Sequence, residues 1–187
     1  MPRVRAGGRE GPEGRRGASN APVCWIAGRP AAGKTTLARR LAGALRARGS
    51  RCEVLDSDEA REVITPSPTY SAGERLIFYR ALAYAARRLA EAGIVAVVAA
   101  TAGSRELHEA VRAACPSIVV VHARCDPETA AARDPKGLYA AARADPSSTL
   151  PGVGTPFDPP TDPDWVVDTD RPVPDEAVAR LADRLLA

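Results

Sequence analysis

The sequence predicts a three-layer α/β fold built on a parallel five-stranded sheet. Short apolar runs alternate with stretches of helical character along most of the chain. These runs are continuously apolar, as expected of strands that are covered on both faces. Repeated strand–helix units need right-handed crossovers, which place helices on both faces of a parallel sheet. The five predicted strands are residues 23–27, 52–55, 94–99, 118–122 and 165–167.

Helical stretches lie between and after these strands. The first has Leu37, Leu41 and Leu45 on one face, the spacing of an amphipathic helix. The predicted helices are residues 34–48, 72–92, 105–113, 127–143 and 174–186. Two other segments, 64–70 and 145–163, are rich in Pro, Ser, Gly and Asp. Loops of this length in a compact domain are usually disordered or functional. Each of these two segments follows residues that could take part in catalysis or binding. We expect them to cover a substrate.

Composition sets the domain organisation. The chain has 187 residues, 45% of them hydrophobic and 26% charged, which suits a single globular domain. Residues 1–20 consist mainly of Gly, Pro and Arg with little to bury, so they are predicted to form a disordered tail. The domain is therefore predicted to span residues 21–187.

Charge and hydropathy exclude several classes of protein. The net charge is +3, and much of the basicity lies in residues 1–16, so a nucleic-acid partner is not expected. No apolar run reaches the length of a membrane span, and the start of the chain lacks the apolar core of a signal peptide. The four cysteines show no C-x-x-C pairing, which argues against a zinc site and a disulfide framework. We expect a cytoplasmic protein without a membrane partner.

A phosphate-binding loop follows the first predicted strand. The residues fit the pattern G-x-x-x-x-G-K-[ST] in full: Gly28, Arg29, Pro30, Ala31, Ala32, Gly33, Lys34 and Thr35. Glycines let consecutive N–H groups point inward, and the helix N-terminus adds a positive dipole. Lys34 is then expected at the β- and γ-phosphates and the Thr35 hydroxyl at Mg²⁺. Thr36 either touches the α-phosphate or packs in the first turn. The loop predicts ATP or GTP binding.

Acidic residues end the second predicted strand. Asp56 and Asp58 lie there, with Arg61 one helical turn later. Ligands of parallel sheets bind at the carboxyl ends of the strands. One carboxylate can belong to the magnesium shell while the other accepts a proton from an attacking hydroxyl. The alternative is that Asp58 only caps the helix that carries Arg61.

The residues after the loop resemble the adenylylsulfate kinase family. Residues 56–61, DSDEAR, look like its D-G-D-N-x-R element, and residues 133–139, RDPKGLY, are similar to its R-D-x-K-G-L-Y signature. Residues 90–93, AEAG, match its A-D-A-G, and residues 150–160 follow in the register of its F-T-G-I-x…Y-x-x-P segment. The resemblance extends from residue 22 to about residue 170. It implies a P-loop NTPase fold with a lid segment.

The resemblance also implies an activity and a set of roles. The activity is Mg²⁺- and ATP-dependent phosphorylation of the 3′-hydroxyl of adenosine 5′-phosphosulfate (APS), which gives 3′-phosphoadenylylsulfate. Lys34, Asp58 and Lys136 are implied as catalytic residues, with Asp58 at the acceptor hydroxyl, Lys136 in the lid, and Thr35 and Asp56 at the metal. Arg61 and Arg75 are implied to clamp the phosphosulfate, and Tyr70 to face the adenine. Forked guanidiniums suit a dianion, and a purine needs an aromatic face. For Arg75 a solvated surface charge, and for Tyr70 simple loop packing, stay open.

Three positions around the acceptor depart from the family pattern. Phe78 occupies the place of an asparagine, Leu150 that of a second purine-stacking phenylalanine, and Ala102 that of a serine. Phe78 and Leu150 are still counted among the acceptor-binding residues. The departures leave open a kinase that acts on a different small-molecule or nucleotide hydroxyl. A non-catalytic nucleotide-binding module is disfavoured, because it has no use for Asp58, Arg61 and Lys136. The resemblance also suggests a homodimer.

Overall fold

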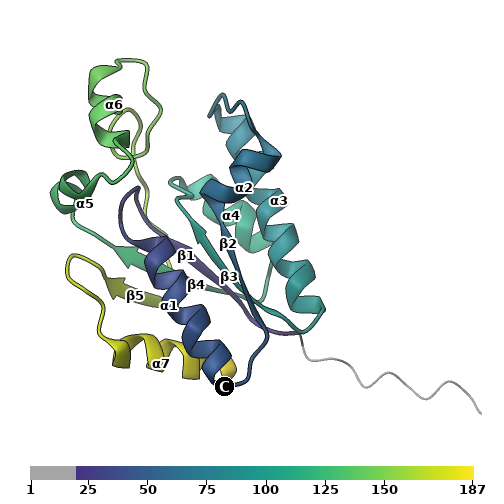
Figure 1. Ribbon diagram of the computed structural model, residues 1–187. Helices are drawn as coiled ribbons and strands as arrows, with labels where there is room; N and C mark the ends of the chain where they lie inside the picture. The colour runs from purple at the N-terminus through teal and green to yellow at the C-terminus, as the bar shows by residue number, and fades with distance from the viewer. Residues whose placement is uncertain (1–19) are drawn as a thin grey trace, which may run out of the picture.

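The computed structural model describes residues 20–187, and apart from Asn20 the predicted tail lies outside the described residues. Five parallel strands form one sheet in the order β2-β3-β1-β4-β5, which confirms the predicted fold class (Figure 1). Every predicted strand is present, with ends that differ from the prediction by no more than two residues. The strands are β1 Val23–Ala27, β2 Cys52–Asp56, β3 Val95–Ala100, β4 Ile118–Arg124 and β5 Trp165–Asp168.

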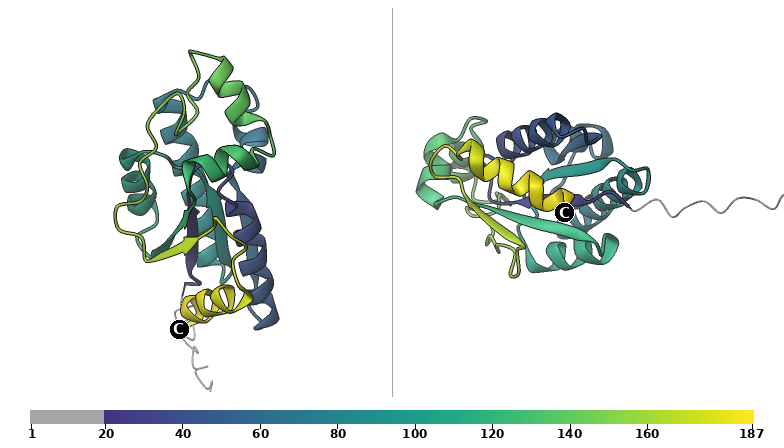
Figure 2. Two further views of the ribbon diagram at one scale, coloured as in Figure 1. Left: turned by 90° about the vertical axis from the view of Figure 1, so that its left-hand side faces the viewer. Right: turned by 90° about the horizontal axis from the view of Figure 1, so that it is seen from below.

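Helices cover both faces of this sheet (Figure 2). They are α1 Lys34–Ala47, α2 Ser57–Ile64, α3 Ala72–Glu91, α4 Arg105–Ala114, α5 Pro127–Arg133, α6 Leu138–Ala144 and α7 Asp175–Leu186. The α1 and α7 helices pack together on one face, and α3 and α4 on the other. Within residues 20–187, no helix is long and apolar enough to cross a membrane.

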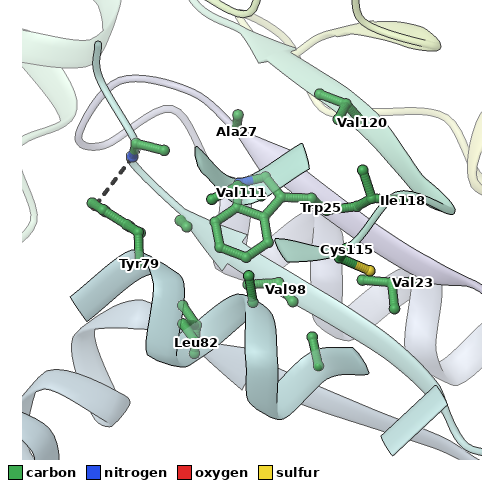
Figure 3. Close-up of a cluster of buried hydrophobic side chains, with 14 of the residues drawn as sticks. Val23, Trp25, Ala27, Tyr79, Leu82, Val98, Val111, Cys115, Ile118 and Val120 are labelled. Carbon is green, nitrogen blue, oxygen red and sulfur yellow. Dashed lines mark hydrogen bonds between the residues drawn. The ribbon is translucent and has the colours of Figure 1, made fainter. Parts of the chain in front are cut away.

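The central strand β1 belongs to both hydrophobic cores. All five of its residues are buried. Trp25 faces α3 and α4 (Figure 3), while Cys24 and Ile26 face α1 and α7. On the second face the leucines of α1 are at most 2% exposed, as the sequence spacing predicted. Burial of each such side chain contributes about 1.5–3 kcal/mol, so the start of α1 is held firmly against the sheet.

The predicted helix over residues 127–143 is wrong, because the chain breaks it into α5 and α6. Pro135 disfavours a helical conformation of the residue before it, and Asp134 has φ 14° and ψ 58°. Gly137 then adopts a left-handed conformation with φ 66°. The Asp134 carboxylate accepts hydrogen bonds from the backbone N–H groups of Tyr139, at 3.0 Å, and Ala140, at 3.1 Å. The break leaves Lys136 on an exposed turn.

The two segments predicted to cover a substrate lie at the carboxyl edge of the sheet, where the cavity described below opens. The second, residues 145–163, returns along α4 and is anchored there. His108 Nε2 lies 3.2 Å from the Asp158 carbonyl oxygen, and the Asp158 N–H donates to the Gly103 carbonyl at 3.0 Å. The Arg29 guanidinium lies 4.9 Å from the centre of the Phe157 ring, which joins this segment to the phosphate-binding loop.

Gly28 is required where β1 ends, because a Cβ atom there would lie 2.5 Å from the backbone oxygen of Ala123 on β4. We predict that Gly28→Ala destabilises the protein by about 1–3 kcal/mol, the usual cost of overpacking. Gly43→Ala is the matched control, since nothing lies within 4 Å of its added Cβ on α1. It should stabilise the helix by up to about 1 kcal/mol. Thermal unfolding of both variants checks the pair, and equal melting temperatures would contradict it.

Candidate active site

A cavity of about 1140 Å³ lies at the carboxyl edge of the sheet. Figure 1 shows α2 and α6 on opposite sides of this edge, with the phosphate-binding loop between them. The walls come from that loop, the starts of α2 and α3, the α5–α6 region, residues 145–151 and residues 169–173. Most of the site residues predicted from sequence line this cavity, and those that do not are Gly28, Arg29, Ala32 and Phe78.

The phosphate-binding loop presents free backbone donors to the cavity. Gly33 is the N-cap of α1 with φ 76°, and no side chain caps the first N–H groups of the helix. The Lys34 ammonium donates to the Arg29 carbonyl at 2.7 Å. Burial lowers the pKa of Lys34 to about 8, against the opposing effect of Asp58 and Asp56. A bound polyphosphate would supply the negative charge that this desolvated ammonium lacks.

Asp56 connects this loop to α2. Its Oδ2 accepts a hydrogen bond from the Thr35 hydroxyl at 2.6 Å, and its Oδ1 accepts from the Asp58 N–H at 2.8 Å. The alternative that Asp58 caps the helix is therefore wrong, because Asp56 is the N-cap. A hydroxyl and a carboxylate at this distance suit Mg²⁺, which prefers oxygen ligands and keeps several waters and phosphate oxygens. The described residues contain no group of three acidic, histidine or cysteine side chains that could form an all-protein metal cage.

Asp58 and Lys136 form an ion pair across the mouth of the cavity. The Lys136 ammonium donates to Asp58 Oδ2 at 2.7 Å, with both side chains more than half exposed. The hydrogen bond to Asp58 raises the pKa of Lys136. The pair joins α2 to the α5–α6 turn beside the phosphate-binding loop.

The Arg61 guanidinium contacts two aromatic rings and a carboxylate. Its guanidinium lies 3.9 Å from the centre of the Phe78 ring and 5.0 Å from that of Tyr70. It donates to Glu74 Oε1 at 3.0 Å in an ion pair that is largely shielded from solvent. Glu74 also accepts from the Thr69 hydroxyl and N–H, and these hydrogen bonds lower its pKa below the ordinary value. Arg61 is thus oriented before any ligand arrives.

Arg75 bridges the two covering segments. Its Nε donates to the Tyr70 carbonyl at 2.8 Å, and its Nη2 donates to the Thr149 carbonyl at 2.8 Å. Desolvation lowers its pKa, and its guanidinium lies 5.4 Å from the centre of the Tyr70 ring. Arg75 is therefore not a simple solvated charge. Tyr70 lies between two guanidiniums, with φ 54° and 42% of its surface exposed.

The three departures from the family pattern have different structural consequences. Phe78 is completely buried and is not among the residues that line the cavity, so its predicted contact with an acceptor is wrong. The ring lies beneath Arg61, so any effect on the acceptor is indirect. Leu150 does line the cavity, as predicted, and packs partly against the cluster formed by Ala32 and Tyr139. Ala102 is buried in the core that α3 and α4 form with the sheet, and it has φ 21°.

The sequence analysis missed several residues that line the cavity or support its wall. Ser71 and Glu74 have the spacing of a helix-capping pair, and Ser71 does cap α3. That spacing gives no sign that the Glu74 carboxylate turns to Arg61. Tyr79 sits at a helical position that its apolar neighbours assign to the core, yet it lines the cavity. Other missed lining residues include Arg133, Thr149 and Arg171.

Comparison with known proteins identifies relatives that match most of the chain. The family model for adenylylsulphate kinase matches residues 20–168. A probable adenylyl-sulfate kinase of Archaeoglobus fulgidus is 38% identical over 149 residues, which cover 80% of this chain and 96% of the relative. A probable bifunctional SAT/APS kinase of Sorangium cellulosum is 35% identical over 163 residues, 87% of this chain. The match spans only 28% of that longer protein.

A solved structure agrees in fold over most of the chain. The APS kinase of Mycobacterium tuberculosis in complex with AMPPNP and APS superposes with a TM-score of 0.84 and 27% identity. The match covers 91% of this chain and 100% of that one. Since the family model covers most of the described residues and the archaeal relative is matched along nearly its whole length, the chain belongs to the adenylylsulphate kinase family.

Proposed function

We propose that this protein transfers the γ-phosphoryl group of ATP to the 3′-hydroxyl of APS, giving 3′-phosphoadenylylsulfate and ADP. One observation carries the proposal. A single cavity holds a complete phosphate-binding loop on one side and two preoriented arginines with an aromatic ring on the other. The Asp58–Lys136 pair lies between them. This is the layout that transfer between a nucleotide and a small anionic acceptor requires.

The nucleotide side is formed by the loop and the start of α1. The first N–H groups of α1 have no side-chain cap and would donate to the β- and γ-phosphates, whose charge the helix dipole favours. Lys34 neutralises charge that develops on the transferred group, and its lowered pKa means that phosphate binding restores its full protonation. Arg133 and Arg171 line the same cavity and add positive charge.

The Thr35 hydroxyl and the Asp56 carboxylate would hold Mg²⁺. When bound, this ion draws negative charge from the phosphate oxygens as the bond to the leaving group breaks. Asp56 is kept in place for this task by its hydrogen bonds to Thr35 and to the Asp58 N–H.

Asp58 orients the acceptor hydroxyl and takes its proton. The new bond forms between the 3′-oxygen and the γ-phosphorus, while the bond from that phosphorus to the β-γ bridging oxygen breaks. In the absence of substrate the Lys136 ammonium donates a hydrogen bond to Asp58 Oδ2. With nucleotide bound, the Lys136 ammonium turns to the phosphate oxygens, and this frees the carboxylate for the hydroxyl.

Arg61 and Arg75 bind the phosphosulfate, and the side chains of Tyr70 and Leu150 form the walls of the purine site. Both guanidiniums are held by protein partners in advance, so little side-chain entropy is lost when the acceptor binds. Leu150 offers an aliphatic surface and no second aromatic face, which favours a looser purine site and keeps a different nucleotide hydroxyl as the second candidate. A homodimer and a cytoplasmic location stay predictions.

Acceptor identity is tested by the rate of ADP formation from Mg·ATP with APS and with a panel of other hydroxyl acceptors. The panel should include adenosine 5′-monophosphate, which lacks the sulfate, and adenosine, which lacks both anionic groups. We expect turnover with APS and weak turnover with the other two. No turnover with APS, together with efficient turnover of another acceptor, would show that the kinase acts on a different hydroxyl.

Asp58→Asn should lower kcat by about 10²–10⁴, because the amide keeps the shape of the side chain but cannot accept the proton. The KM values for ATP and APS should change little. Glu53→Gln is the matched control, an exposed carboxylate on β2 that does not line the cavity. Steady-state kinetics of both variants check this, and an Asp58→Asn enzyme with wild-type kcat would remove Asp58 from the reaction.

Phe78→Asn should not restore the family contact with the acceptor. The ring is completely buried under Arg61, so its loss leaves a cavity and a buried amide that lacks partners. We expect a loss of at least about 3 kcal/mol of stability and a higher KM for APS. Ile77→Asn is the control, because Ile77 is the preceding residue on α3 and is 70% exposed. This substitution should change stability by less than about 0.5 kcal/mol. A stable Phe78→Asn enzyme with improved APS binding would refute this account of Phe78.

A further inference from the structure

Tyr79 places a phenolic hydroxyl at the inner wall of the active-site cavity. The residue is 3% exposed on α3, yet it is one of the residues that line the cavity. Its ring packs edge-on against Phe78, with the ring centres 5.3 Å apart, and against Trp25, at 6.3 Å. Figure 3 shows the ring extending from α3 into this cluster. The surrounding rings therefore fix the position of the hydroxyl.

The hydroxyl uses only half of its hydrogen-bonding capacity. A phenol can donate one hydrogen bond and accept others. The Tyr79 oxygen accepts from the Ala102 N–H at 3.1 Å, the interaction drawn as a dashed line in Figure 3. Among residues 20–187, no carbonyl, carboxylate or hydroxyl accepts its proton. The hydroxyl proton is thus available to a ligand in the cavity that Tyr79 lines.

The surroundings favour a neutral phenol beside an anion. Burial raises the pKa of Tyr79 above its ordinary value, so the hydroxyl keeps its proton at neutral pH. Arg61 and Arg75 are both close enough to act on its titration, which places the hydroxyl in the region of positive charge. The adjacent side chains, Phe78 and Ala102, carry no polar atom.

We propose that Tyr79 recognises the acceptor, its hydroxyl donating a hydrogen bond to an anionic oxygen of the phosphosulfate group alongside Arg61 and Arg75. This inference rests on the proposed function. In this protein the polar contribution that Phe78 and Ala102 cannot make then comes from the next position on α3. The hydrogen bond from the Ala102 N–H holds the oxygen in place, while the proton can rotate about the C–O bond toward a ligand in the cavity.

Tyr79→Phe tests the donor, because it removes one oxygen and leaves the ring in the aromatic cluster. Loss of a hydrogen bond to a charged group should raise the KM for APS about tenfold. The KM for ATP and kcat should change little, since the hydroxyl does not face the nucleotide side. Tyr84→Phe is the control: the same change on the same helix, at a residue that is 54% exposed and does not line the cavity.

A second variant separates recognition from support of the Ala102 loop. Fluorotyrosine at position 79 has a more acidic phenol, and its phenolate still accepts from the Ala102 N–H but cannot donate. The KM for APS should therefore begin to rise at a lower pH in this protein than in the wild type. A purely structural role would leave the two pH profiles alike.

The outcomes are distinct. An APS-selective rise in KM for Tyr79→Phe, with an earlier alkaline rise for the fluorinated protein, supports the assignment. An unchanged KM for APS in Tyr79→Phe, or identical pH profiles, would overturn it while the proposed function stands. A wild-type enzyme that does not phosphorylate APS would overturn the proposed function and this inference together.

Discussion

The hydrogen bond from the Thr35 hydroxyl to Asp56, 2.6 Å long, joins the two halves of the site. Thr35 lies in the first turn of α1, shortly after β1, and Asp56 ends β2. The strands β1 and β2 are not neighbours, because β3 lies between them. The bond therefore spans the carboxyl end of β3 and sets the nucleotide half beside the acceptor half. It depends on β1 being buried on both faces and on a glycine at position 28, where the backbone of β4 leaves no room for a side chain.

The acceptor half is organised by charge before any substrate binds. Arg61 is held by Glu74 and two aromatic rings, and Arg75 by two backbone carbonyls of the covering segments. Such preorganisation reduces the entropy lost on binding and keeps the positive charge directed into the cavity. The two segments that the sequence marks as irregular thus act as supports for these arginines. Their irregular backbone provides the carbonyl groups that a regular helix would have used internally.

The sequence predicted what depends on local pattern and failed where contacts are distant. Continuous apolar runs located all five strands, and the glycine and lysine spacing located the phosphate-binding loop. The break after Arg133 was overlooked because the Ala-rich pattern continues on both sides of Pro135 and Gly137. The pairing of Lys136 with Asp58 joins residues 78 positions apart, and no local pattern encodes it. The burial of Phe78 beneath Arg61 likewise depends on how α2 packs on α3, so the alignment position alone suggested a contact that the fold does not allow.

We propose that one cavity holds both substrates with Asp58 between them. This proposal is tested most directly by a crystal structure of the protein with Mg²⁺, a non-hydrolysable ATP analogue and APS. We expect polyphosphate on residues 28–36, the metal at the Thr35 hydroxyl, and the APS 3′-hydroxyl within hydrogen-bonding distance of Asp58. Lys136 should have left Asp58 for the phosphates. A structure in which APS binds away from Arg61 and Arg75, or turns its ribose from Asp58, would contradict the account.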